Sequence, residues 1–183
     1  MKFLCTASCS AAKNAGFSLL ELLLVVGVGA LLILAGLATY RMIVQDSAVN
    51  QTLSAIFATK ASVKKTFASQ NGYGAGSLIP ALVAASGLPA SIRVDTGTMT
   101  ANHPLGGAFD VVAAVGAFRI ELYDLEQSDC MKIGLAFDTR SEDDFVALEI
   151  GADTYDLTTS PTAASLQTSC APGGNTDMAF VFR

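Results

Sequence analysis

The chain has 183 residues, of which 51% are apolar, and a formal net charge of −5. This length accommodates one domain with an appendage, and the acidic balance argues against general binding to nucleic acid through the phosphate backbone. The apolar content and the mean hydropathy of +0.48 exceed what a soluble domain needs. Much of the excess lies in the first quarter of the chain, which predicts a membrane-directed N-terminus joined to one acidic soluble domain.

The first residues of the chain, MKFLCTASCSAAKNAG, contain Lys2 and Lys13 and no acid. A positive flank of this kind keeps an N-terminus in the cytoplasm and orients the apolar segment that follows. Residues 22–40 form 19 consecutive uncharged positions. A helix over residues 17–40 would be about 36 Å long, enough to cross a hydrocarbon core of about 30 Å.

An ordinary secretory signal peptide, cleaved near the small residues 36–38, is one interpretation of this segment. A periplasmic binding or enzymatic domain on an uncleaved signal anchor is another. Two features argue against a disposable signal: the apolar stretch is longer than a signal core of about 7–15 residues, and Glu21 lies at its start. An acid near the centre of an inserting helix costs about 2.5–3.5 kcal/mol, a cost from which a disposable segment gains nothing.

The carboxylate of Glu21 needs a partner, because an ionisable group inside a membrane is rare unless it is paired. A cut between Gly16 and Phe17 would create an α-ammonium four residues before Glu21, on the same face of a helix. In a packed array of such helices, the ammonium of one chain would instead meet Glu21 of its neighbour. Breaking a buried pair is costly, so Glu21 would fix the axial register between subunits.

The segment KNAG (residues 13–16), followed by FSLLE (17–21) and an apolar run, resembles the class III signal of type IV pilins and pseudopilins. The resemblance implies that a prepilin peptidase cuts after Gly16 and methylates the new N-terminus at Phe17. It also implies that Glu21 is the carboxylate that sets the register during assembly. Residues 27–40 contain no proline, which favours the b subclass of type IV pilins.

Three glycines, Gly27, Gly29 and Gly36, interrupt the apolar segment. Each lowers helix stability by about 1 kcal/mol relative to Ala. Close packing between helices is one explanation, since small residues let backbones approach in membranes. Local softening of the helix during assembly is the other, and both remain open.

The helix is expected to continue to Gln70, because no proline occurs before residue 80 and Asn71-Gly72 is a plausible stop. Apolar residues recur along this second half at helical spacing, so that one face can pack on a globular head. They are Val49, Leu53, Ile56, Val63 and Phe67. Lys60, Lys64 and Lys65 lie mostly on other faces and are expected to form a contact with the acidic face of another subunit.

The remainder, residues 71–183, is expected to form an α+β head with an antiparallel sheet against the long helix. Its predicted elements are a turn at 71–77, a short helix at 78–85, a turn at 87–89, strands at 109–115 and 117–123, and strands at 145–150 and 178–182. The pattern of residues 125–137 is ambiguous, and the resemblance to the b subclass implies a short helix there that carries Cys130 and Ile133. The predicted division of the chain is a leader at 1–16, a transmembrane or filament-core helix at 17–40, its amphipathic continuation at 41–70, and the head at 71–183.

Four cysteines are present, but Cys5 and Cys9 would leave with the leader. Cys130 and Cys170 remain, and an even pair in an exported domain favours a disulfide over two separate thiols. Its loop of about 40 residues would stabilise the head by roughly 3–4 kcal/mol in the chain-entropy model. The pair also resembles the C-terminal disulfide that encloses the variable region of pilins.

Catalytic motifs are absent from the sequence, and we expect no enzymatic activity, cofactor or metal site. His103 is the only histidine and is expected to be a surface loop residue because it precedes a proline in a turn. Residues 142–144 are three consecutive acids, which are expected to form a solvated turn rather than a calcium site, since no calcium-loop spacing follows.

Together these features predict a structural subunit of a type IV pilus that serves adhesion, DNA transfer or motility. The resemblance implies that its partners are copies of itself, a prepilin peptidase, an assembly ATPase, a platform protein and inner-membrane lipid, with a host or cell-surface receptor as a further possibility. It would span the inner membrane once, with its head in the periplasm, and later lie in an extracellular pilus. A minor pilin or a type II secretion pseudopilin is the alternative within the same machinery.

Overall fold

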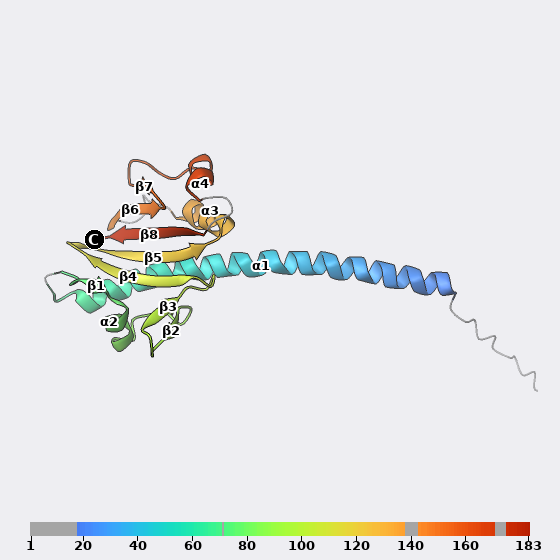
Figure 1. The fold of residues 1–183 in the computed structure, drawn as a ribbon, viewed down its shortest axis with the longest axis horizontal. Coiled ribbons are helices and arrows are strands. Elements are labelled where there is room, and N and C mark those ends of the chain that lie inside the picture. The colour runs from blue at the N-terminus through green and yellow to red at the C-terminus, as the bar shows by residue number, and fades with distance from the viewer. Residues whose placement is uncertain (1–17, 71, 138–142, 171–174) are drawn as a thin grey trace, which may run out of the picture. The chain divides into compact units, whose positions relative to one another are not determined.

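The computed structural model describes residues 18–70, 72–137, 143–170 and 175–183. An N-terminal helix precedes an antiparallel sheet, which confirms the expected α+β class (Figure 1). The contacts divide the chain into two units, one ending at Met42 and the other running from Ile43 to Arg183.

Helix α1, Leu19–Phe67, begins in the first unit and continues into the second. The stretch Leu19–Leu37 is long and apolar enough to cross a membrane, and its side chains are not buried within the chain. It remains helical through Gly27, Gly29 and Gly36, where an added Cβ would meet no atom within 4 Å. A helix that is apolar on every side is typical of a segment that a membrane or other helices surround.

The second part of α1 packs on the head as the helical spacing predicts. Val49, Ile56 and Val63 are buried, while Leu53 and Phe67 pack against the same core. Polar Thr52 also lies on this face, and its hydroxyl donates to the carbonyl of Ala48 at 2.9 Å, which satisfies it within the helix. The helix ends at Phe67, three residues before the expected Gln70.

Eight strands of the described residues form one sheet, in which each pairing is antiparallel. The order is β2-β3-β4-β5-β8-β6-β7, with β1 paired to β4 (Figure 1). The strands are β1 Gly76–Ser77, β2 Arg93–Asp95, β3 Thr100–Asn102, β4 Ala108–Ala114, β5 Ala117–Leu125, β6 Phe145–Ile150, β7 Asp153–Tyr155 and β8 Thr176–Phe182. The C-terminal strand β8 therefore lies between β5 and β6, and this non-local pairing joins strands β2–β5 to strands β6 and β7.

Alternation along β5 gives the sheet one buried and one outer face. Phe118, Ile120 and Leu122 are fully buried, whereas the residues between them are partly exposed. The same alternation continues in β4, where Phe109 and Val111 are buried. Strands β4 and β5 correspond to those predicted at 109–115 and 117–123, and they pair as a hairpin around Gly116.

Aromatic side chains fill the core between the sheet and the helices. Phe137 follows helix α3, Gln127–Ala136, and its ring centroid lies 4.8 Å from that of Phe180 and 5.1 Å from that of Phe145. On its other side Phe137 stacks on Phe57 of α1, with centroids 5.8 Å apart. Such ring pairs add about 0.5–1.5 kcal/mol each beyond the area that they bury.

Several head elements differ from the expected ones. Helix α2 is Ile79–Ala84, close to the expected 78–85, and α3 starts at Gln127 because Leu125 still belongs to β5. The expected turn at 71–77 contains the short strand β1. Helix α4, Ala163–Ser169, and the short strands β2, β3 and β7 had no predicted counterpart.

Candidate functional site

The first turn of α1 carries Glu21, the residue that the sequence singles out. Its backbone N–H donates to the carbonyl of Ser18 at 2.9 Å, so the side chain projects from an ordered first turn. An acid at this position is favourable because the N-terminus of a helix carries partial positive charge. The predicted cleavage-site residues Gly16 and Phe17 lie outside the described residues, so cleavage between them and the pairing of the Phe17 ammonium with Glu21 stay predictions.

Beyond Glu21, α1 presents a continuous apolar surface that none of the described residues covers. Its large side chains are from about half to more than three-quarters exposed, and they occupy all sides of the helix. They include Leu19, Leu22, Leu23, Val25, Val26, Leu31, Leu32, Ile33, Leu34 and Leu37. Contiguous apolar area of this kind marks an interaction surface, either with lipid or with other helices.

The expected disulfide between Cys130 and Cys170 is present. Both cysteines are fully buried, and the bond joins α3 to the end of α4, with the two Cα atoms 5.9 Å apart. Helix α4 begins with a capping box, in which Ser165 N–H donates to Thr162 Oγ1 and Thr162 N–H donates to Ser165 Oγ. The two helices touch closely at Gly134, where an added Cβ would lie 2.8 Å from Leu166.

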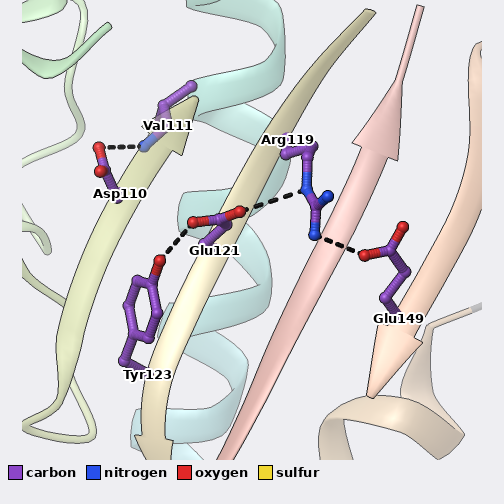
Figure 2. A network of polar contacts seen from close by, with 6 residues as sticks. All are labelled: Asp110, Val111, Arg119, Glu121, Tyr123 and Glu149. Carbon is purple, nitrogen blue, oxygen red and sulfur yellow. Dashed lines mark hydrogen bonds and ion pairs between the residues drawn. The ribbon is translucent and has the colours of Figure 1, made fainter. Parts of the chain in front are cut away.

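A polar network lies on the outer face of the sheet (Figure 2). The guanidinium of Arg119 bridges Glu121 of the same strand and Glu149 of β6, and the hydroxyl of Tyr123 donates to Glu121. This hydrogen bond and partial burial raise the pKa of Tyr123 to about 12. Asp110 lies across from Glu121 in β4, and its carboxylate accepts from the N–H of Val111 at 2.7 Å.

A shallow cavity of about 210 Å³ is lined by Arg119, Glu121, Tyr123 and Glu149. These side chains form ion pairs and hydrogen bonds with one another. Two carboxylates share one guanidinium, and the tyrosine stays protonated across the physiological range. Such an arrangement ties β5 to β6 across the intervening β8 rather than poising an acid, a base or a nucleophile. Within the described residues, no three His, Cys, Asp or Glu side chains gather as a metal site would require.

His103 is buried rather than exposed, and the expectation of a surface loop residue is wrong. The side chain is 2% exposed, and its Nε2 donates to the carbonyl oxygen of Tyr123 at 3.0 Å. In the turn after β3, the N–H of His103 donates to the carbonyl of Gly107. This turn places the imidazole of His103 against β5. Burial lowers the pKa of His103, which keeps the imidazole neutral at physiological pH.

Gly107 is required at this turn because the backbone of β5 passes directly over it. An added Cβ would lie 2.0 Å from the carbonyl oxygen of Tyr123 and 2.6 Å from His103 Nε2. We expect Gly107→Ala to lower the free energy of unfolding by roughly 2–4 kcal/mol, since the clash is with backbone. Thermal unfolding of the full chain in detergent measures the loss. The control is Gly97→Ala, where the new Cβ would meet only Asp95 Oδ1 at 3.3 Å; equal midpoints for the two variants would contradict the packing described.

The lysines of α1 do not all face outward as expected. Lys64 Nζ lies 2.5 Å from Asp144 Oδ2 of the same head, and Lys60 Nζ lies 3.6 Å from the same oxygen. The hydrogen bond from Lys64 holds the pKa of Asp144 below its usual value. The expected contact of these lysines with another subunit stays a prediction, and the acidic turn at 143–144 is partly neutralised from within. Lys65 is exposed.

Comparison with known proteins identifies a matching family and a similar solved structure. The PilS N-terminal family matches residues 45–183. Among solved structures, the chain is similar to TcpA, a type IV pilin from Vibrio cholerae El Tor biotype, with a TM-score of 0.53 and 14% identity over 75% of this chain and 99% of that one. No curated protein matches. At this identity the structural similarity is a similarity of fold.

Proposed function

Since the chain belongs to the PilS N-terminal family and has the fold of a type IV pilin, we propose that it is a pilus subunit that polymerises through its N-terminal helix. The observation that carries this proposal is the uncovered apolar surface of Leu19–Leu37 in a chain whose head is otherwise well packed. Lipid covers such a surface before assembly. Neighbouring helices cover it in a filament, where packing rather than the hydrophobic effect drives association.

Processing at the N-terminus completes the proposal. A prepilin peptidase removes residues 1–16 after Gly16 and methylates Phe17, and the new ammonium pairs with Glu21 of an adjacent subunit. Residues 17–40 then form the filament core, residues 41–70 continue the helix into the head, and residues 71–183 supply the outer surface. An assembly ATPase and a platform protein extract the subunit from the inner membrane, and a receptor contacts the exposed head in the extracellular pilus.

The b subclass is the proposed placement within type IV pilins. It is supported by the proline-free segment 27–40, which stays helical through its three glycines. The disulfide of the head, together with the absence of a metal-binding cluster from the described residues, favours a pilin over a secretion pseudopilin. Neither the subclass nor the choice between a pilin and a pseudopilin changes the proposal that the chain forms filaments, because both choices concern the same class of assembly machinery.

Electron microscopy and shearing test the proposal directly. Cells that express the chain with its assembly machinery are sheared, and the released material is examined for filaments and probed for the chain. We expect filaments that contain the chain as their main component and disappear when the peptidase is absent. Recovery of the chain only from the membrane or as a free periplasmic protein, under conditions where the machinery assembles another pilin, would overturn it.

A further inference from the structure

A pocket of about 220 Å³ lies where α1 enters the head. Its apolar walls come from α1 and from the turn after β3, and its other side consists of carboxylates from the end of β5, the N-cap of α3 and the first turn of α3. The lining residues are Val44, Gln45, Ala48, Pro104, Leu105, Asp124, Glu126 and Asp129. The three acids share this pocket with no basic side chain.

One carboxyl oxygen of Asp129 lacks a hydrogen-bond donor among the described residues that line this pocket. The residue is 5% exposed in the first turn of α3, and its Oδ1 has no hydrogen-bond partner among the described residues. The nearby ammonium of Lys132 is engaged by Asp46 at 2.7 Å. Burial raises the pKa of Asp129. A buried carboxyl oxygen without a donor is unusual in a native structure and calls for a partner.

Basic side chains lie near the C-terminal end of α1. Lys64 and Arg183 line a second hollow near Gln70, and Lys65 follows Lys64 in the sequence. Lys65 is exposed, and within the described part of the chain no carboxylate pairs with it. From Ala48 to Lys65 the helix rises about 26 Å, so this ammonium cannot reach the pocket of its own chain.

From this arrangement, and resting on the proposed filament, we propose that Lys65 of one copy inserts into the Asp129 pocket of the next. The aliphatic stem of the lysine packs on Val44 and Pro104, and the ammonium donates to Asp129 with Glu126 beside it. Donor and acceptor lie at opposite ends of one subunit, so the contact is head-to-tail. A head-to-tail contact that does not close generates an open helical polymer, which is the symmetry of a filament.

Zero-length cross-linking of intact, unaltered filaments tests this contact. A carbodiimide joins an ammonium to a carboxylate only where the two touch, and peptide mapping by mass spectrometry identifies the linked residues. We expect Lys65 to be linked to Asp129, Glu126 or Asp124, a link that must be intermolecular because of the 26 Å separation estimated from about 1.5 Å per residue. The Lys64–Asp144 and Lys132–Asp46 links within each subunit serve as internal controls.

Absence of a Lys65 link while both internal controls appear would overturn the contact, as would linkage of Lys65 to an acid outside the pocket. In either case the filaments themselves would still support the proposed function. Failure to obtain filaments at all, in contrast, would count against the proposed function. The two failures are therefore distinguishable.

A substitution series supplies an independent readout. We expect Lys65→Ala to lower the yield of sheared filaments about tenfold, which corresponds to about 1.4 kcal/mol per contact, and Lys65→Arg to restore most of it. Arg93→Ala is the matched control, since it removes another exposed cation of the head and should leave the yield unchanged. Normal yield from Lys65→Ala, or an equal loss from Arg93→Ala, would contradict the proposal.

Discussion

Glu21→Ala is expected to abolish pilus assembly while the chain still inserts into the membrane and loses its leader. The substitution makes the inserting segment more apolar, so insertion does not suffer. In a helix bundle, however, it leaves the ammonium of the neighbouring Phe17 buried without a partner, and breaking a buried pair costs about 3–5 kcal/mol. Immunoblots of the sheared fraction and of the membrane fraction measure the two effects separately.

Ser18→Ala is the control for this experiment. It changes another polar side chain of the same turn, but the hydrogen bonds of that residue are made by its backbone carbonyl. We expect this variant to assemble normally. Glu21→Gln separates charge from size, and it should fail like the alanine variant. Normal pili from either Glu21 variant would refute the register role.

Replacing both Cys130 and Cys170 with Ala is expected to lower the stability of the head by about 4 kcal/mol. The bond closes a loop with a sequence separation of 40, and the chain-entropy model assigns about that stabilisation to a loop of this length. For a domain of this size the loss corresponds to a fall of roughly 10–15 °C in Tm. Near-ultraviolet circular dichroism of the full chain in detergent follows the unfolding.

Cys5 and Cys9 offer the matched control for the disulfide. Substituting both with Ala in the unprocessed chain changes the same number of cysteines but leaves the bond between α3 and α4 intact. We expect an unchanged midpoint. If instead the Cys130/Cys170 variant melts at the same temperature as the parent chain, the bond does not hold the C-terminal region of the head in place.

Strong local patterns account for the parts of the fold that could be predicted. The apolar run and the helical spacing of Val49, Ile56 and Val63 specify α1, because both depend on residues within a few turns of one another. Alternation on either side of Gly116 likewise specifies the β4–β5 hairpin. The pairing of Cys130 with Cys170 followed from the number of cysteines outside the predicted leader.

Contacts between distant segments account for what the sequence could not show. The position of β8 between β5 and β6 depends on pairings such as Phe118 with Phe182, which no local pattern encodes. Strands of three residues, such as β2, contain too few positions for alternation to be visible.

Contacts between distant segments also determine which polar side chains are buried or paired. His103 is buried because a turn folds it onto β5, and Lys64 is paired because the turn at Asp144 lies beside α1. The one local signal at His103 was the glycine pair at 106–107, since a glycine in a tight turn allows the close backbone approach that buries the ring.

The intact mass of the chain recovered from sheared filaments tests the central claim most directly. A register pair between Phe17 and Glu21 requires a free amine at Phe17, so the account predicts a mass equal to residues 17–183 plus one methyl group, with the Cys130–Cys170 bond formed. A filament subunit that begins at Met1, or at a residue beyond Tyr40, would contradict it.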